Sequence, residues 1–207
     1  MLELLPPLDL RAPGQSLKEG LSELRAHQAR VLKSRHPLRA ELEGFTAWPL
    51  VPGPSAYYYL VHTPRPQAEP VLEVVRQQHR QIVALYREAM ALGSDGAAFE
   101  QLLGRHMDTE ERTLYPLYQK IVQEERLIRE LGYEHLGLRR GLPEFRPFLQ
   151  KMAAGETSKR DKDGFDIRFF HLFEHHMERE EESLLPVLEH FCPVEAAEAA
   201  REFTSVS

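Results

Sequence analysis

Apolar residues recur at spacings of three and four through most of the chain after residue 70, which is the period of an amphipathic helix. Four segments follow this pattern: 71–92, 97–124, 125–152 and 165–191. The connections between them are short, and the longest is the polar stretch 155–164. The pattern predicts an all-α fold in which residues 71–193 form an up-down-up-down four-helix bundle. Within the third segment we expect Gly141, Pro143 and Pro147 to bend or interrupt the helix.

Residues 1–70 have a different pattern, and we expect them to form an N-terminal helical and aromatic extension. Ser16 and Glu19 form a capping box ahead of spaced apolar residues, which predicts a helix over about 17–34. The segment 45–66 is rich in proline and aromatic residues, and a short hairpin could form in it. Its aromatic residues predict that the extension packs on the bundle. At the other end, residues 194–207 are expected to form a C-terminal tail that is frayed or briefly helical.

Six polar side chains interrupt the apolar face of the predicted helices, at positions where the repeat requires core residues. A buried carboxylate costs several kcal/mol unless it is paired or bound to a metal ion, so two carboxylates together with four imidazoles are hard to explain by packing. Every one of the four helices contributes at least one of them. The six are His79, His106, Glu110, His135, His176 and Glu180.

The second and fourth predicted helices carry the same short motif. RHMDTEERTLYP (105–116) and HHMEREEESLLP (175–186) align without a gap. Each copy places a histidine four residues before a glutamate, so the two side chains lie on one face of the helix. We therefore expect two ligand-bearing units that face each other across the core, each partnered by a helix with one histidine.

Four imidazoles and two carboxylates gathered on the axis of a bundle make a plausible dinuclear metal site. The carboxylates can bridge two ions, and a bridging oxo or hydroxo group would still leave positions open for a small molecule. These donors suit iron or manganese, and imidazole also suits zinc or copper, so the donor types alone leave the metal open. The order His-x-x-x-Glu differs from the Glu-x-x-His motif of the ferritin-like bundles.

The series formed by these six residues resembles the hemerythrin-like, or HHE cation-binding, family, and the resemblance covers about residues 71–191. It implies two non-haem iron ions in a four-helix bundle. It also implies His79, His106, Glu110, His135, His176 and Glu180 as their ligands, with Glu110 and Glu180 as bridges. The chain departs from the oxygen-carrying members, which place a second histidine one turn further along the third helix, where this chain has Arg139. The iron–sulfur repair branch of the family carries a cysteine-bearing N-terminal domain, and the only cysteine of this sequence is Cys192, which disfavours that branch.

The resemblance implies a protein that binds or activates dioxygen or a related small molecule, such as nitric oxide or peroxide. Three interpretations stay open: a reversible binder or sensor, an oxidase or peroxidase with an unknown substrate, and a metal-free or zinc-bound bundle that acts through partners. We expect Glu111, Glu134, Glu181 and Glu182 to be solvated, and His171 and His175 to lie off the site. Tyr86 is expected to pack in the core, from which its hydroxyl could reach a ligand.

Charge and hydropathy narrow the function classes further. The net charge of −6 argues against a primary role in nucleic-acid binding. The apolar runs are too short for a membrane span, and the first residues lack a basic region followed by a long apolar stretch, so we expect a cytoplasmic protein. The single cysteine, Cys192, excludes an intrachain disulfide. The pattern does not indicate an oligomeric state.

Overall fold

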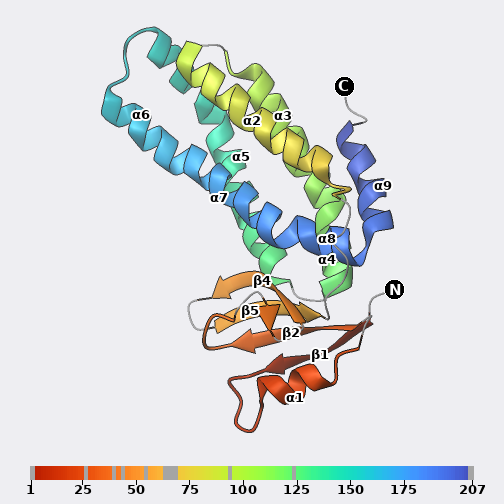
Figure 1. The fold of residues 1–207 in the computed structure, drawn as a ribbon. Helices are drawn as coiled ribbons and strands as arrows, with labels where there is room; N and C mark the ends of the chain where they lie inside the picture. Colours follow the sequence, from red (N-terminus) through yellow and green to blue (C-terminus); the bar gives the residue numbers. More distant parts are fainter. Residues whose placement is uncertain are drawn as a thin grey trace.

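The computed structural model describes residues 3–25, 28–38, 41–42, 45–53, 56–62, 70–92, 95–122 and 125–204. A helical bundle occupies most of the molecule, and a small β-sheet lies across one end of it (Figure 1). The prediction of a mostly helical bundle is confirmed. The expectation of an all-α chain is wrong, because the N-terminal part is built around strands.

Four helical stretches form the bundle. The first is α2 (Glu73–Leu92), and the second consists of α3 (Ala97–Arg112) and α4 (Leu114–Val122). The third is α5 (Arg126–Ala153). The fourth runs without interruption from Lys159 to Phe191 and alternates α- and π-helical turns: α6 (Lys159–Phe165), η1 (Asp166–Phe170), α7 (His171–Arg179), η2 (Glu180–Leu184) and α8 (Leu185–Phe191).

Proline affects the second stretch but leaves the third unbroken. Pro116 has no N–H and crowds the carbonyl four residues earlier, and the expected single helix over 97–124 is broken at Thr113, between α3 and α4. In contrast, α5 continues through Pro143 and Pro147, so the expected interruption does not occur. Both of these prolines are exposed, and water can satisfy the carbonyls that they leave without an amide partner.

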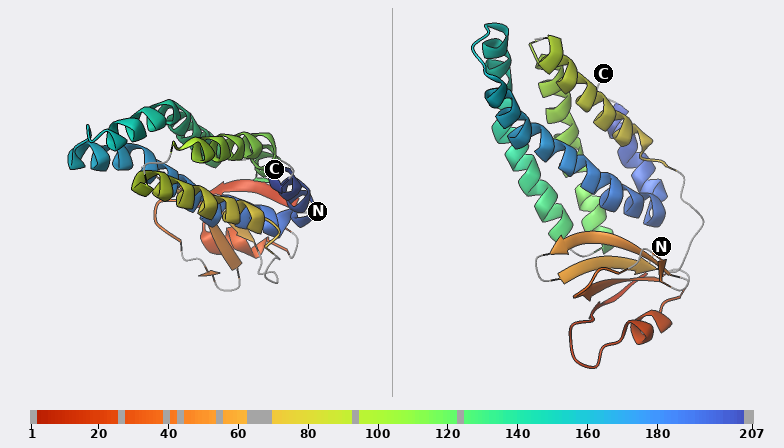
Figure 2. Two further views of the ribbon diagram at one scale, coloured as in Figure 1. Left: turned by 90° about the horizontal axis from the view of Figure 1, so that it is seen from above. Right: turned by 60° about the vertical axis from the view of Figure 1, so that its left-hand side comes forward.

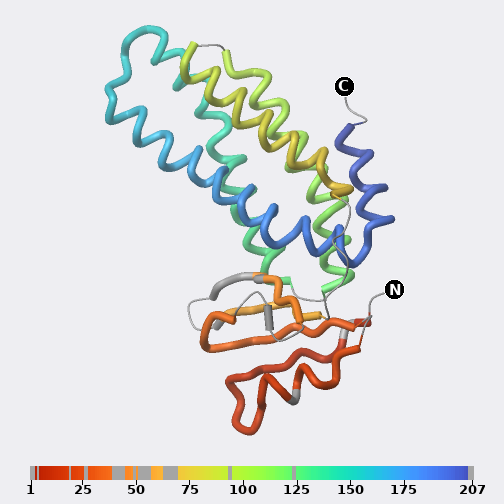
Figure 3. Tube along the Cα trace, viewed as in Figure 1, coloured from red at the N-terminus to blue at the C-terminus, as the bar shows by residue number. Residues whose placement is uncertain are grey.

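The fourth helical stretch begins earlier than its apolar pattern suggests. Ser158 and Asp161 form a reciprocal capping box, in which each side chain bonds the backbone N–H of the other residue. The helix therefore begins at Lys159, inside the segment 155–164 that was expected to be a loop. Past the bundle, α9 (Pro193–Thr204) forms a complete helix where a tail was expected, and it lies beside α2 (Figure 3).

A five-stranded sheet replaces most of the expected N-terminal helix. Its strand order is β1-β2-β5-β4-β3; β1 and β2 are parallel, and the other pairs are antiparallel. The predicted hairpin in 45–66 corresponds to β4 and β5. The strands and the short helix are β1 (Glu3–Asp9), α1 (Leu17–Ser22), β2 (Gln28–Ser34), β3 (Glu41–Leu42), β4 (Phe45–Gly53) and β5 (Ala56–His62).

The sheet is covered on both faces, which explains why β2 was expected to be part of a helix. In β2, Val31 packs toward the bundle, whereas Leu32 packs on the opposite face with Leu21 of α1. A strand buried on both faces shows a short apolar run and no alternation, and periodicity alone cannot distinguish such a run from part of a helix. Of the helix expected over about 17–34, only Leu17–Ser22 is helical, and it forms α1.

The sheet and the base of the bundle share one apolar core. Leu60 of β5 belongs to the same buried cluster as Leu114, Leu184 and Phe191 of the bundle. Figure 2 shows the sheet lying across this end of the helices, with α1 on its far face. The expectation that the N-terminal part packs on the bundle is confirmed. No helix among the described residues is long and apolar enough to cross a membrane.

Candidate metal centre

The six polar residues singled out in the sequence meet at the middle of the bundle. They come from all four helical stretches: His79 from α2, His106 and Glu110 from α3, His135 from α5, His176 from α7 and Glu180 from η2. Each is at most 2% exposed. The 3.6-residue period places each histidine and its glutamate one turn apart on an inward face, so the fold brings together the six side chains that the sequence pattern singled out.

These residues form two overlapping groups that share both carboxylates. His79 and His106 face Glu110 and Glu180 on one side, and we call this the His79–His106 half. His135 and His176 face the same two glutamates on the other side, which we call the His135–His176 half. Within each group the potential ligand atoms lie within 4.8 Å of one another. Each group could hold a metal ion.

Each carboxylate has one oxygen for each half. Glu110 Oε1 lies 2.9 Å from His106 Nε2, and its Oε2 lies 3.4 Å from His135 Nε2. Glu180 Oε2 lies 3.3 Å from His79 Nε2, and its Oε1 lies 3.5 Å from His176 Nε2. Both carboxylates are therefore placed as bridges between two positions, the geometry expected of ligands shared by a pair of ions.

Buried polar atoms at the centre lack hydrogen-bond partners. Among the described residues, no hydrogen bond reaches Nε2 of His79 or His106, either oxygen of Glu110, or Oε2 of Glu180. Buried polar atoms are almost always satisfied, and leaving one unsatisfied costs about 1–3 kcal/mol. Five such atoms converging on one point fit a site whose missing partners are metal ions.

In each of the four histidines, Nδ1, the ring nitrogen that faces away from the centre, makes a hydrogen bond to a residue outside the set of six. Nδ1 of His79 donates to Glu181 (2.7 Å), and Nδ1 of His135 donates to Glu111 (2.7 Å). Nδ1 of His176 donates to Glu134 (3.1 Å). This leaves the lone pairs of Nε2 directed inward, as in metal-bound histidines whose second nitrogen is fixed by a carboxylate or carbonyl.

The fourth ring, His106, has a neutral partner. Its Nδ1 donates to Gln78 Oε1 (3.0 Å), and Gln78 Nε2 donates to the carbonyl of Phe203 in α9 (2.8 Å). The Phe203 ring also packs against His106, with centroids 5.7 Å apart. The C-terminal helix therefore fixes a residue of the centre, although the sequence showed no motif there.

Arginines hold two of the outer carboxylates. Arg139 donates to Glu111 (2.6 Å) and to Asp108, and Arg179 donates to Glu134 (2.6 Å) and Glu130. Burial alone would raise the pKa values of Glu111 and Glu134, but bonds to arginine and histidine outweigh it and lower both. Both groups are ionised acceptors at neutral pH. Arg139, which stands at the position of the absent second histidine, thus supports the ring of His135.

Several expectations about single residues need correction. Glu111 and Glu181 are partly solvated, as expected, with side chains 39% and 38% exposed, but each also bonds a ring of the centre. Glu134 was expected to be solvated, but its side chain is only 12% exposed and bonds His176. Glu182 is exposed, and the side chains of His171 and His175 are 63% and 61% exposed, as expected. Tyr86 donates its hydroxyl to Asp166 within an aromatic cluster, so it does not serve the centre.

Tyr115 is a further residue beside the centre that the sequence pattern missed. Its hydroxyl donates to Glu180 Oε1 (2.9 Å) and lies 3.0 Å from His135 Nε2, and the residue is only 4% exposed. On an unbroken helix Tyr115 would lie about 140° around the axis from Glu110. The break at Thr113 brings it inward. One signal was available, since the aligned copy of the motif has Leu185 in its place.

Comparison with known proteins agrees with this geometry. Residues 70–188, more than half of the chain, match the family described as the hemerythrin HHE cation binding domain. Neither the curated proteins nor the solved structures contain a match to the chain. The matched segment spans α2 to the middle of α8 and includes all six central residues, and the chain belongs to the hemerythrin HHE cation-binding family.

Proposed function

We propose that this chain is a non-haem diiron protein that binds or activates dioxygen or a related small molecule, such as nitric oxide or peroxide. Its role would lie in sensing or in defence against oxidative stress. The observation that carries the proposal is the pair of shared carboxylates, each with one oxygen toward either half of the centre. Four imidazoles complete a nitrogen and oxygen donor set that suits iron or manganese.

Iron in this position would supply one-electron redox chemistry and open coordination positions. The protein would supply the rest. His79, His106, His135 and His176 would hold the two ions through Nε2, and Glu110 and Glu180 would bridge them. Burial keeps bulk water away from these groups. The Tyr115 hydroxyl donates to Glu180 and is positioned to hold a proton beside the centre.

Metal content is the first test. We expect about two irons per chain after anaerobic loading of metal-free protein, with an ultraviolet and visible spectrum that changes on reduction with dithionite. Glu110→Ala and Glu180→Ala should each lose at least one ion. Glu182→Ala is the matched control, because this glutamate is exposed on the same turn as Glu180 and should retain both.

The results separate the proposal from its alternatives. Absence of iron, with no uptake by the metal-free protein, would contradict it, and a stoichiometric zinc ion would favour the zinc-bound bundle. With iron present, a spectrum that forms and reverses with oxygen supports a binder or sensor. Steady consumption of oxygen or peroxide with a reductant supports an oxidase or peroxidase instead.

We also propose that the protein is cytoplasmic. We expect its ligand to be a small molecule, and we expect it to bind neither nucleic acid nor membranes. The net charge of −6 supports the ligand class, since a nucleic-acid surface requires clustered basic residues. Cell fractionation would test the location, and a gel-shift assay at low salt would test the nucleic-acid exclusion.

A further inference from the structure

We propose that the N-terminal sheet carries a second ligand site, a pocket that binds a free amino acid. The carboxylate of the ligand would bond to the guanidinium of Arg30, and its ammonium would bond to the carboxylate of Glu23. The site goes beyond the proposed diiron function and does not depend on it. Three observations support it, namely the pocket itself, the burial of Arg30 and the balance of charge in the lining.

The pocket lies on the face of the sheet that is turned away from the bundle, where α1 also lies (Figure 1). Residues of β1, of the loop after it, of α1 and of β2 line it. Its volume is about 540 Å³. Sites for small molecules have volumes of about 300–1,000 Å³, so the pocket is large enough for an amino acid.

A strand irregularity and a glycine shape the walls of the pocket. β1 pairs with β2 before and after Pro6 and Pro7, but the register shifts between Leu5 and Leu8. Proline has no N–H to donate, so these two residues suit a bulge at an edge strand. On the other side α1 approaches β1 at Gly20, where a Cβ would overlap the Leu8 side chain. The bulge and α1 both border the pocket.

Arg30 of β2 is the buried charge in the lining. The residue is 7% exposed, and arginine is rarely so buried unless it is fully paired. Its Nη1 donates to the carbonyl of Gly20 (3.0 Å), and its Nη2 donates to Glu23 (2.7 Å). Nε is also buried and makes no hydrogen bond within the described part of the chain. One donor on the side of the guanidinium that Glu23 contacts is therefore unsatisfied.

Glu23 is an incomplete partner for this cation. Its side chain is 66% exposed, whereas that of Arg30 is 9% exposed. An ion pair with one exposed partner contributes little to stability, and Glu23 bonds only one nitrogen of the guanidinium. A carboxylate that replaced Glu23 could bond Nε and Nη2 together, which is the stronger bidentate arrangement. Glu23 could then turn toward solvent at the edge of the pocket.

The charges of the lining favour a zwitterion over a simple ion. Among the described residues that line the pocket, only Arg30 and Glu23 are charged. A simple anion on Arg30 would bring a second negative charge close to Glu23, and a simple cation would face Arg30. An amino acid carries one charge of each sign on neighbouring groups. It can therefore be inserted into the ion pair and leave both protein charges with an opposite partner.

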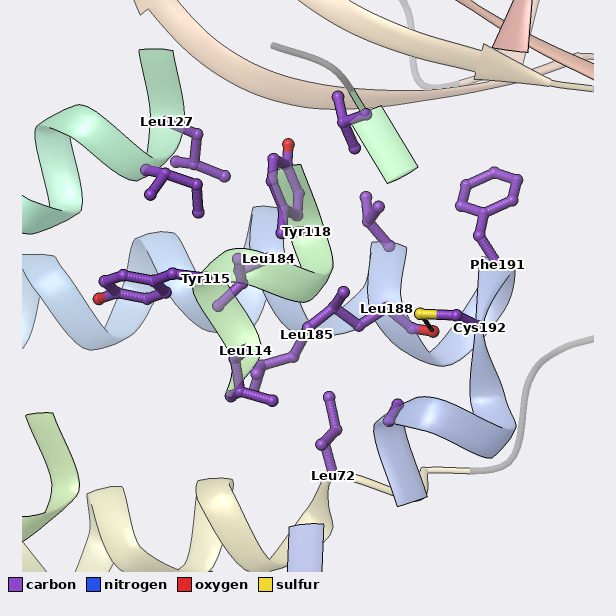
Figure 4. Close-up of a cluster of buried hydrophobic side chains, with 14 of the residues drawn as sticks. Leu72, Leu114, Tyr115, Tyr118, Leu127, Leu184, Leu185, Leu188, Phe191 and Cys192 are labelled. Carbon is purple, nitrogen blue, oxygen red and sulfur yellow. Dashed lines mark hydrogen bonds between the residues drawn. The ribbon is translucent and has the colours of Figure 1, made fainter. Parts of the chain in front are cut away.

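The sheet separates this pocket from the metal centre. On its bundle face it packs against the apolar cluster of Figure 4, which includes Leu127 and Phe191. On the α1 face, Leu8 and Leu32 belong to a different cluster. Binding at the pocket can therefore be measured whether or not the centre holds iron.

Isothermal titration calorimetry of the full chain with each of the standard free L-amino acids would test the site. We expect at least one of them to bind with one molecule per chain. Glu23→Gln should weaken this binding about tenfold, because the ammonium loses its charged acceptor. Glu3→Gln is the matched control, since this glutamate is exposed on β1 outside the pocket lining and should leave binding unchanged.

The two charges of the ligand can be tested one at a time. The amino acid that binds most tightly is compared with its amide, which has no carboxylate, and with the same acid lacking the amino group. Each should bind about tenfold more weakly. Arg30→Met should abolish binding. Because Arg30 also holds Gly20, circular dichroism checks the fold of this variant, and the comparison of Glu23→Gln with Glu3→Gln decides if it does not fold.

The outcomes are distinct. A native chain that binds none of the amino acids would overturn the proposal. Equal binding by Glu23→Gln and the native chain would also overturn it, and would show that the Arg30–Glu23 pair only fastens α1 to the sheet. Equal binding of the acid that lacks the amino group would contradict it too, because the pocket would then accept simple anions. Weaker binding in each of these comparisons, with Glu3→Gln unchanged, would support it.

Discussion

At the scale of single residues, the outer ring of hydrogen bonds determines how each imidazole faces the centre. Three rings are held by carboxylates and the fourth, His106, by the amide of Gln78. Gln78 is itself fixed by the carbonyl of Phe203. The orientation of His106 thus depends on Phe203, which is not one of the six central residues.

We predict that Gln78→Leu lowers metal affinity about 10- to 100-fold, the usual cost of losing an outer partner of a metal-bound histidine. The leucine keeps most of the side-chain volume but offers no acceptor to His106. Competition with a chromophoric chelator would measure the affinity. Gln77→Leu, exposed one residue earlier, is the control, and an equal loss in both variants would contradict a positioning role for Gln78.

The central histidines also predict how pH acts on metal binding. Burial opposes a charge on His79, but the neighbouring carboxylates of Glu110, Glu180 and Glu181 outweigh it and raise its pKa well above the usual value. The pKa of His135 is raised in the same way, chiefly by Glu110. Both shifts favour the protonated imidazole in the metal-free protein, so a metal ion must compete with protons for these rings.

Protonation of these rings stabilises the metal-free fold below the unfolded histidine pKa of about 6.5, and this contribution is lost as pH rises through the raised folded values. Metal binding strengthens over the same range. We therefore predict that the difference in Tm between metal-loaded and metal-free protein increases from about pH 6 to about pH 9. Paired thermal melts with and without a chelator would measure it, and a constant difference would be inconsistent with proton displacement.

At the scale of elements, one buried ion pair joins the first and last helices of the bundle. Glu189 of α8 accepts from the backbone N–H of Leu72 and from both terminal nitrogens of Arg76, all within 2.9 Å. Its side chain is 8% exposed and that of Arg76 is 18% exposed. The start of α2 is thereby fixed against the end of the metal-bearing stretch.

Glu189→Gln should lower the free energy of unfolding by about 2–3 kcal/mol, because it leaves the Arg76 guanidinium without its charged partner in a mostly buried setting. Some exposure of Arg76 keeps the loss below that of a fully buried pair. Urea denaturation would measure the change. Glu195→Gln, exposed on α9, is the control and should change stability by less than about 0.5 kcal/mol.

The helical elements could be predicted from the sequence, and the irregular turns could not. A regular 3.6-residue period predicted the four helices and the six central residues, since each of the six lies on an inward face of its helix. Tyr115 was missed because the helix break at Thr113 moves it from the position that a regular helix would give. Glu111 and Glu181 were missed because each lies beside the inward face and reaches the outer nitrogen of a central ring. The hairpin of β4 and β5 was within the expectations, whereas β2 was missed because it is buried on both faces and shows no alternation.

At the scale of the whole molecule, the shared core couples the sheet to the centre. Leu60 of β5 and Leu184 of η2 lie in one buried cluster, and Leu184 is four residues from Glu180. A sheet with its own separate core could unfold independently of the bundle. This one has only a thin second core, formed with α1 on its far face.

We predict that Leu60→Ala destabilises the helices as well as the sheet, by about 2–5 kcal/mol in a single transition. Helical circular dichroism and the fluorescence of Trp48, which packs against the shared core, should give coincident unfolding curves. Helices that melt at the native midpoint while the tryptophan signal is lost early would show two independent units.

The π-helical turn η2 has a consequence for the length of the last helix. A π turn accommodates one residue more than the α-helix around it, so it acts as a single-residue insertion between Glu180 and Glu189. Because the π turn absorbs the extra residue, deleting Glu182 would let a regular α-helix close with little change of direction beyond it. Glu180 would stay at the centre, and Glu189 would still face Arg76. A relative with one residue fewer between these two glutamates could therefore keep both the centre and the ion pair that joins its first and last bundle helices.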